Sequence, residues 1–435
     1  MRFWLHLLRT HWREALDALR TRPGRASLLE ILNELGWPLL GPVAAFYRRR
    51  VARRVRIVAV VGSMGKTTTA RATLAALGLP DRPAIEHNAQ ASVALALLRI
   101  RPHQKRNVLE IGIHHAGQMA EYADVVRPDV AVVTAIGSEH HTSLGTLETT
   151  RSEKAKIVET LPPGGLAVLN GDDPTVLLMM GRTLARVVTF GFGENCDVRA
   201  SGVQMDWPRG TRFTLHAGGR EREVRTRLFG RHMVYPILAA AAVAQAEGVD
   251  LDAALARLER LRPTRARLQP VRLPSGAVVL RDDWKSAMET TEAFLDVLAE
   301  VPAGRRIVVL GMVTELARRT GTIYQGVGER LARSASLVIF FGKGTFFRSL
   351  RVGAMRGGLP AEAVVHAGWS VCRAIEAIPK DLGPGDVVLL KGSHSQRLER
   401  IAAALQGRQV RCDRPHCFAH GIVCGDCPEL SREWI

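Results

Sequence analysis

The sequence predicts an α/β protein in which two domains with largely parallel sheets lie between a short N-terminal segment and a cysteine-rich tail. Short β-branched apolar runs alternate with helical patterns along most of the 435 residues, which is typical of parallel sheets. A glycine-rich turn joins the first such run to a helix. This length is sufficient for several domains with cores of their own. We divide the chain at 1–55, 56–265, 266–410 and 411–435.

The composition is strongly basic, with a formal net charge of +18 and a pI near 10.6. Such a surface favours acidic partners such as nucleotides, phosphorylated carriers or anionic lipid, although an arginine-rich coding background explains the same charge. Aromatic residues make up only 5% of the chain, which argues against a base-stacking nucleic-acid surface. Charged residues interrupt the N-terminal apolar run, so it is not a secretory signal, and we expect a cytoplasmic protein.

The N-terminal segment, residues 1–55, predicts basic helices. Arginines lie among apolar residues that recur at helical spacing. These apolar residues are Trp4, Leu8, Trp12, Leu16 and Leu19. A second apolar stretch from Leu28 to Tyr47 contains glutamates and prolines, and is therefore a poor membrane span. One interpretation is a peripheral contact with the inner face of the membrane or with an anionic carrier. The other is a pair of helices that pack on the next domain.

The glycine-rich turn predicts a phosphate-binding loop. The pattern indicates a strand from Ile57 to Val61 and a helix from Ala70 to Leu77. The turn between them reads Gly62-Ser63-Met64-Gly65-Lys66-Thr67-Thr68. Glycines let backbone N–H groups approach phosphates, Lys66 can reach the terminal phosphates, and the Thr67 hydroxyl can hold Mg²⁺. Val60 stands where the longer P-loop form has a glycine, so the match is to a shorter form. The alternative is a glycine-rich turn with a chance lysine.

A second candidate ligand follows in the apolar run from Val108 to Gly112, which contains Glu110. A carboxylate at the carboxyl end of a parallel strand faces the ligand crevice, so we predict that Glu110 binds Mg²⁺. Further buried strands are predicted at 129–134, 165–169, 278–280, 307–310, 337–341 and 386–390.

Over roughly residues 56–405 the chain resembles the Mur ligases, most closely those that add D-alanyl-D-alanine to a muramyl tripeptide. Besides the glycine loop, the resemblance rests on an ordered series of segments, namely Leu109-Glu110-Ile111-Gly112, His140 before Leu144-Gly145, Lys154, Val168-Leu169-Asn170-Gly171-Asp172-Asp173, Val309-Leu310-Gly311 with Glu315-Leu316, Lys391-Gly392-Ser393 and Arg397-Leu398-Glu399. The resemblance implies a P-loop ATPase domain followed by a Rossmann-like ligase domain.

The resemblance also implies roles for individual residues. Glu110 and His140 would bind a metal between ATP and substrate, with His141 as the alternative to His140. Lys154 would be carbamylated and help to bind a second Mg²⁺; the alternative is a solvated helix lysine. The implied contacts with ATP are Gly62, Ser63, Gly65, Lys66, Thr67, Thr68, Asn170, Arg267 and Asp282. Asp283 is the alternative to Asp282.

Several positions depart from the family pattern. The family's nucleotide-contacting asparagines are replaced by Met233 and Pro236, and an asparagine and an aspartate further on are replaced by Lys285 and Met312. Ala266 stands where the family has the glycine before Arg267. The segment Lys391-Gly392-Ser393-His394-Ser395 would lie near the incoming amine.

The tail, residues 411–435, contains four closely spaced cysteines, namely Cys412, Cys417, Cys424 and Cys427. Four thiolates suit a tetrahedral Zn²⁺ site, and we predict a structural zinc there. An iron–sulfur cluster fits the same ligand count, and unliganded thiols are the third interpretation.

Together these features predict an ATP-dependent ligase that joins a carboxylic acid to an amine, an amino acid or small peptide, through an acyl phosphate, with Mg²⁺. The basic segment of about 55 residues before the glycine loop leaves no room for the family's UDP-binding domain, so we expect an acid other than a standard UDP-muramyl peptide. The substitutions Met233, Pro236, Lys285 and Met312 favour an alternative function, that of an ATP-binding scaffold or switch without amide chemistry.

Overall fold

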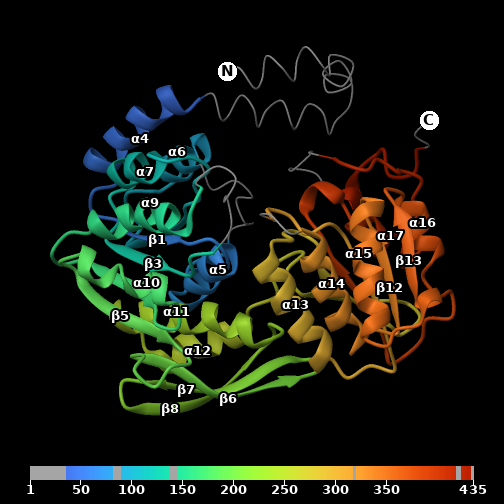
Figure 1. Cartoon of the computed structure of the whole chain (residues 1–435). Coiled ribbons are helices and arrows are strands. Elements are labelled where there is room, and N and C mark those ends of the chain that lie inside the picture. The colour runs from blue at the N-terminus through green and yellow to red at the C-terminus, as the bar shows by residue number, and fades with distance from the viewer. Residues whose placement is uncertain (1–35, 82–89, 138–144, 317–319, 418–422, 433–435) are drawn as a thin grey trace. The chain divides into compact units, whose positions relative to one another are not determined.

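The computed structural model describes residues 36–81, 90–137, 145–316, 320–417 and 423–432. The chain forms two compact units (Figure 1), of which one runs from Gly36 to Thr264 and the other begins at Arg265. Among the described residues no helix is long and apolar enough to cross a membrane.

The first unit is built on an eight-stranded sheet in the order β2-β1-β3-β4-β5-β6-β7-β8. Its strands are β1 (Arg56–Val61), β2 (Arg106–Glu110), β3 (Val130–Val133), β4 (Leu166–Asn170), β5 (Arg186–Gly191), β6 (Val198–Asp206), β7 (Gly210–Ala217) and β8 (Arg220–Thr226). Neighbours from β2 to β6 are parallel, and β6, β7 and β8 form an antiparallel meander. The central strands β3 and β4 are buried along their whole length, as expected of parallel strands with both faces covered.

Helices cover this sheet, namely α4 (Trp37–Arg50), α5 (Lys66–Ala76), α6 (Ala91–Leu98), α7 (Gln118–Val126), α9 (Leu147–Glu159), α10 (Pro174–Leu177), α11 (Val234–Ala246) and α12 (Leu251–Glu259), with 3-10 turns η1 (Met180–Arg182) and η2 (Arg231–Met233). Helix α4 packs on α6 and α7. Its buried Arg48 donates to the carbonyl oxygens of Val126 and Ala52 and forms an ion pair with Asp129. Residues 36–55 are therefore part of the first unit. Trp4 to Leu19 lie outside the described residues.

The second unit has a six-stranded sheet in the order β13-β12-β11-β14-β10-β9. Its strands are β9 (Gln269–Arg272), β10 (Val278–Asp282), β11 (Arg305–Leu310), β12 (Leu337–Phe341), β13 (Val364–Gly368) and β14 (Asp386–Lys391). All pairings are parallel except that of β9 with β10. The remaining elements are α13 (Met288–Glu300), α14 (Thr320–Ala332), α15 (Gly344–Arg356), α16 (Val371–Glu376) and α17 (Glu399–Leu405), with 3-10 turns η3 (Ala361–Ala363), η4 (His394–Gln396) and η5 (Cys424–Asp426).

The predicted α/β class with two largely parallel sheets is confirmed. The sequence patterns did not predict the antiparallel meander or β9. Helix α5 begins at Lys66, not at Ala70, so the lysine and the threonines of the glycine loop form its first turn.

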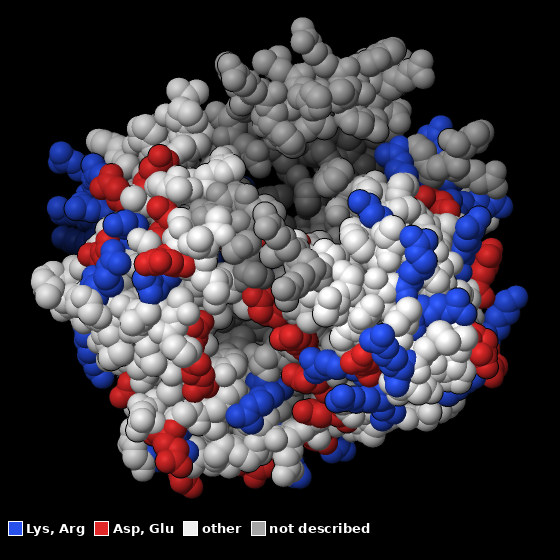
Figure 2. Space-filling view, viewed as in Figure 1, with Lys and Arg blue, Asp and Glu red and all other residues white. Residues whose placement is uncertain are grey.

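Many surface arginines are accompanied by carboxylates. On the face shown in Figure 2, Lys and Arg side chains are interleaved with Asp and Glu side chains. Exposed ion pairs include Arg49 with Asp124 and Arg222 with Asp252. Much of the positive charge is thus locally compensated.

The predicted zinc site is not supported. Among the residues described, no group of three or more His, Cys, Asp or Glu side chains could hold a metal ion. Burial raises the pKa of the Cys424 and Cys427 thiols. The tail is held instead by hydrogen bonds to its backbone, for example from Arg400 to the carbonyl oxygen of Cys412.

Candidate active site

The glycine loop lies between β1 and α5. Gly62 has a φ of +147°, and a Cβ there would collide with the Thr134 hydroxyl at the end of β3. Gly65 has a φ of +80° and directly precedes the first residue of α5. Both positions therefore require glycine, one for close approach and one for the left-handed backbone. The N–H groups of the first turn of α5 therefore lie at the glycine turn, where they can bind an anion.

Lys66 is held over the loop. Its side chain is buried, and Nζ donates to the carbonyl oxygens of Gly62, at 2.9 Å, and Ser63, at 3.1 Å. The ammonium group therefore lies at the start of α5, where helix geometry already favours an anion.

Thr67 and Glu110 meet at the carboxyl ends of β1 and β2. The Thr67 hydroxyl donates to Glu110 Oε1 at 3.1 Å. The parallel register pairs Val60 with Glu110, which brings the end of β2 beside the loop that follows β1. A hydroxyl and a carboxylate are oxygen donors of the kind that Mg²⁺ takes, so these two residues fit a magnesium ion.

Lys154 reaches the same loop from α9. Its side chain is 1% exposed, and Nζ donates to Ser63 Oγ at 2.9 Å. Ser63 Oγ also accepts from the backbone N–H of Gly137 at 2.9 Å. The interpretation of Lys154 as a solvated helix lysine is therefore wrong.

Of the remaining predicted residues of the first unit, the structure describes Asn170 and Thr68. Asn170, at the end of β4, donates to the carbonyl oxygen of Thr134 at 2.8 Å, and so supports the strand end beside the loop. The Thr68 hydroxyl is buried and lies 3.2 Å from the hydroxyl of Thr264. His140 and its alternative His141 lie outside the described residues.

In the second unit, Asp282 ends β10 beside the buried Lys391, the first residue of the segment that we predicted to lie near the incoming amine. Lys391 Nζ donates to Asp282 Oδ2 at 2.8 Å, to the carbonyl oxygen of Lys285 at 2.7 Å and to the Thr290 hydroxyl at 3.1 Å. Burial lowers the pKa of Lys391, while Asp282 opposes that effect. This lysine fixes both ends of the segment from Asp282 to Lys285. The alternative Asp283 is buried and forms an ion pair with Arg281.

Trp284 carries the ring contacts of this segment. The Arg267 guanidinium lies over its ring at 5.3 Å from the centroid, and the His394 ring lies at 4.2 Å between centroids. The backbone N–H of His394 also donates to the carbonyl oxygen of Trp284 at 2.8 Å. Ala266 has a φ of +55°, a conformation that glycine adopts more readily, which gives a physical reason for the family's glycine there.

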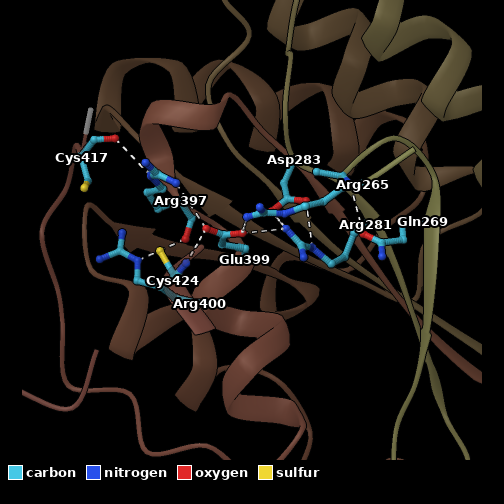
Figure 3. Close-up of polar contacts among 10 residues, drawn as sticks. Arg265, Gln269, Arg281, Asp283, Arg397, Glu399, Arg400, Cys417 and Cys424 are labelled. Atoms are coloured by element: carbon cyan, nitrogen blue, oxygen red, sulfur yellow. Dashed lines mark hydrogen bonds and ion pairs between the residues drawn. The ribbon is translucent and has the colours of Figure 1, made fainter. Parts of the chain in front are cut away.

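Glu399 is the centre of a buried ionic cluster (Figure 3). Its carboxylate accepts from Arg265 at 2.6 Å, Arg281 at 3.2 Å and Arg397 at 3.3 Å. The backbone N–H of Cys424 donates to it as well. Burial by itself would raise the pKa of Glu399, but the neighbouring Arg265 and Arg281 outweigh burial and lower it to about 2. The resemblance singled out Glu399 only as part of a segment and gave no sign of these partners.

Two family models match the chain: the Mur ligase middle domain over residues 60–244, and the glutamate ligase domain of Mur ligases over residues 266–394. The UDP-N-acetylmuramoyl-tripeptide–D-alanyl-D-alanine ligase of Mycobacterium bovis is 31% identical over 375 residues, which cover 82% of this chain and 74% of the relative. The enzyme of the same name from Escherichia coli K12 is 30% identical over 374 residues, with 84% and 80% covered.

Solved structures agree in fold. MurF from Acinetobacter baumannii matches with a TM-score of 0.74 at 24% identity, over 85% of this chain and 80% of that one. The MurF ligase from Thermotoga maritima in complex with ADP matches with a TM-score of 0.71 at 22% identity, over 85% and 83%. With two family models and relatives above the 30% level along most of its length, this chain belongs to the Mur ligases, the ATP-dependent ligases that form carbon–nitrogen bonds.

Proposed function

We propose that this protein uses ATP to join the terminal carboxylate of a muramyl peptide to the amino group of a dipeptide. The γ-phosphoryl group of ATP passes to the carboxylate and gives an acyl phosphate and ADP. The amine then attacks the acyl carbon, a proton leaves the nitrogen, and phosphate departs as the amide forms. Catalysis of this kind depends on positioning and on neutralisation of charge at the transferred phosphoryl group.

The observation that carries the proposal is the convergence of Lys66, Lys154 and the Thr67–Glu110 contact on one glycine loop. In our proposal the loop N–H groups and Lys66 bind the β- and γ-phosphates. The other proposed nucleotide contacts are Gly62, Ser63, Gly65, Thr67, Thr68, Asn170, Arg267 and Asp282.

Thr67 and Glu110 would hold Mg²⁺, which supplies positive charge to the phosphates when bound. His140 is proposed as a further ligand of a metal near the substrate. A carbamate on Lys154 would replace its positive charge by a negative one and supply oxygen donors beside Ser63. Its buried position next to a hydroxyl and a backbone N–H is compatible with this.

The substrates are proposed from the relatives. Our expectation of a different acid is not supported, since the matching enzymes are named as ligases of UDP-N-acetylmuramoyl-tripeptide with D-alanyl-D-alanine. We therefore propose these two compounds as acid and amine. The segment of residues 391–395 is proposed to lie near the amine, and we extend it to Arg397 as the loop of residues 391–397. We keep the boundaries at 265 and 410 as a proposal and give up the one at 55, since residues 36–55 pack within the first unit.

The direct test is ADP release by the purified protein with Mg²⁺-ATP, UDP-N-acetylmuramoyl-tripeptide and D-alanyl-D-alanine, with the amide identified by mass spectrometry. We expect turnover that needs both substrates. In Lys66→Ala, kcat should fall about 10²- to 10³-fold because a positioned charge at the phosphates is lost. Circular dichroism of the variant checks that it is folded.

The other outcomes separate the alternatives. ADP release without acid or amine would favour an ATP-binding switch over the ligase. Turnover with D-alanyl-D-alanine but only with an acid other than the UDP-linked tripeptide would reject the acid that we propose and retain the ligase.

A further inference from the structure

The C-terminal tail, residues 411–435, is described over 411–417 and 423–432, and both of these stretches contact the second unit. The N–H groups of Arg411 and Cys412 donate to the carbonyl oxygen of Leu430 at 2.9 and 3.0 Å, so the tail returns on itself. The Asp413 carboxylate accepts from Ser370 Oγ at 2.7 Å and from the backbone N–H groups at the start of α16. The tail is thus built into this unit although it lies beyond the matched family domain.

One buried guanidinium joins the tail to the loop of residues 391–397. Arg400 is 1% exposed. Toward the tail it donates to the carbonyl oxygens of Cys412, at 2.9 Å, and Arg414, at 2.8 Å. Toward the loop it donates to the carbonyl oxygens of Gln396 and Arg397, each at 3.1 Å. A planar guanidinium with five N–H donors can hold four carbonyl groups in a fixed relation, which a lysine cannot do.

A second contact fixes the same loop directly. The Cys417 N–H donates to the carbonyl oxygen of Ser395 at 2.8 Å, and its own carbonyl accepts from Arg397 Nε at 3.2 Å. Figure 3 shows Arg397 between Cys417 and Glu399. Arg397 is 2% exposed and has a φ of +53°, so the loop turns sharply at the point where the tail holds it.

The loop in turn supports the segment that begins at Asp282. Its first residue, Lys391, holds Asp282 and the carbonyl of Lys285, and His394 contacts Trp284 through its backbone and its ring. A continuous series of contacts therefore runs from Asp413 in the tail through Arg400 and the loop to Trp284.

We propose that the tail is a positioning element of the ligase site, which acts through Arg400 and Cys417 to fix the loop of residues 391–397 and so sets the KM for the amine. The inference rests on the proposed function, in which this loop lies near the amine. A loop that samples several positions binds a small amine in the productive one only part of the time, which raises KM for that substrate more than KM for ATP.

The test uses the full chain with Asp413→Ala, which detaches the tail from α16 without touching the loop. Arg400→Lys, which keeps the charge and loses the fixed geometry, is the second variant. Arg432→Ala is the matched control, because this residue lies in the same tail with a 67% exposed side chain. Hydrogen exchange of the peptide that spans residues 391–397 is measured without substrates, and KM is then measured for D-alanyl-D-alanine and for ATP.

In Asp413→Ala and Arg400→Lys we expect faster exchange in the loop, a KM for D-alanyl-D-alanine raised about tenfold, and a KM for ATP changed less than about twofold. The Arg432→Ala control should match the wild type. Rapid exchange in the tail with unchanged exchange in the loop would overturn the proposal. So would an equal rise of both KM values, or a lower melting temperature with both KM values unchanged.

The two arms separate this inference from the proposed function. If the wild-type protein does not ligate the substrates, the proposed function fails. The exchange arm alone then decides whether the tail controls the loop.

Discussion

The carboxyl ends of the two sheets are organised differently. In the first unit, Lys66 donates to two backbone carbonyls of the glycine loop and Lys154 donates to the Ser63 hydroxyl. In the second unit, Lys391 and Arg281 are buried against Asp282, Asp283 and Glu399. The first arrangement places two lysines at the loop that we propose to bind phosphate, whereas the second pairs its charges within the protein. We therefore expect substitutions to affect activity in the first and stability in the second.

The largest effect should come from Lys391→Met. It removes the partner of Asp282 and the three hydrogen bonds of a buried ammonium group, and we expect the free energy of unfolding to fall by about 3 to 5 kcal/mol. Urea unfolding measures the change. Lys343→Met, at an exposed lysine after β12, should change it by less than about 0.5 kcal/mol. A small loss in Lys391→Met would contradict a stabilising role for the ion pair between Lys391 and Asp282.

Glu399→Gln should show the stabilising role of the second unit's charges through the pH dependence of the free energy of unfolding. The pKa of Glu399 is lowered from 4.5 to about 2, so its ionised form stabilises the fold above about pH 4.5, and that contribution is lost as the pH falls toward 2. The shift corresponds to a contribution on the order of 3 kcal/mol at neutral pH.

We would therefore measure urea unfolding of both proteins between pH 7 and pH 3. The stability of Glu399→Gln should be lower at pH 7 and should approach that of the wild type as the pH falls. Glu362→Gln, at an exposed glutamate of the same unit, is the control and should follow the wild type throughout. Parallel curves for Glu399→Gln and the wild type would rule out the lowered pKa.

In the first unit the corresponding test is Lys154→Ala. We expect kcat to fall about 100-fold with little change in melting temperature, because the side chain acts at the glycine loop. Lys156→Ala is the matched control, since that residue lies on the same helix, is partly exposed and forms an ion pair with Glu159. If Lys154 is carbamylated, bicarbonate should raise the activity of the wild type and not that of the variant. An equal fall of kcat in both variants would show that Lys154 has no specific role in the active site.

The contrast also explains what the sequence could predict. The strand β1, the glycine loop and Glu110 were predictable because each is a local pattern and parallel strands end at one edge. The start of α5 was placed too late because three threonines carry no apolar helical period and have low helix propensity.

The contacts between residues far apart in the chain could not be predicted from local sequence patterns. Lys391 and Asp282 are 109 residues apart, and Glu399 and Arg281 are 118 apart, so no local spacing relates them. Lys154 lies 91 residues from Ser63 and was identified only through the resemblance to the Mur ligases. The tail misled us for a related reason: cysteine spacing suggested a metal, but the partners of the tail are buried arginines earlier in the chain.

The smallest effect should come from metal removal at the tail. A zinc-selective chelator should leave both the melting temperature and the hydrogen exchange of the tail unchanged, because Arg400, Arg397 and Asp413 hold it through hydrogen bonds that need no metal. The chelator is applied without ATP, so that magnesium plays no part in the result. In Arg400→Lys the tail should exchange faster with or without chelator. Faster exchange of the wild-type tail on chelation would instead show that its cysteines bind a metal, and the attachment by arginine would then be secondary.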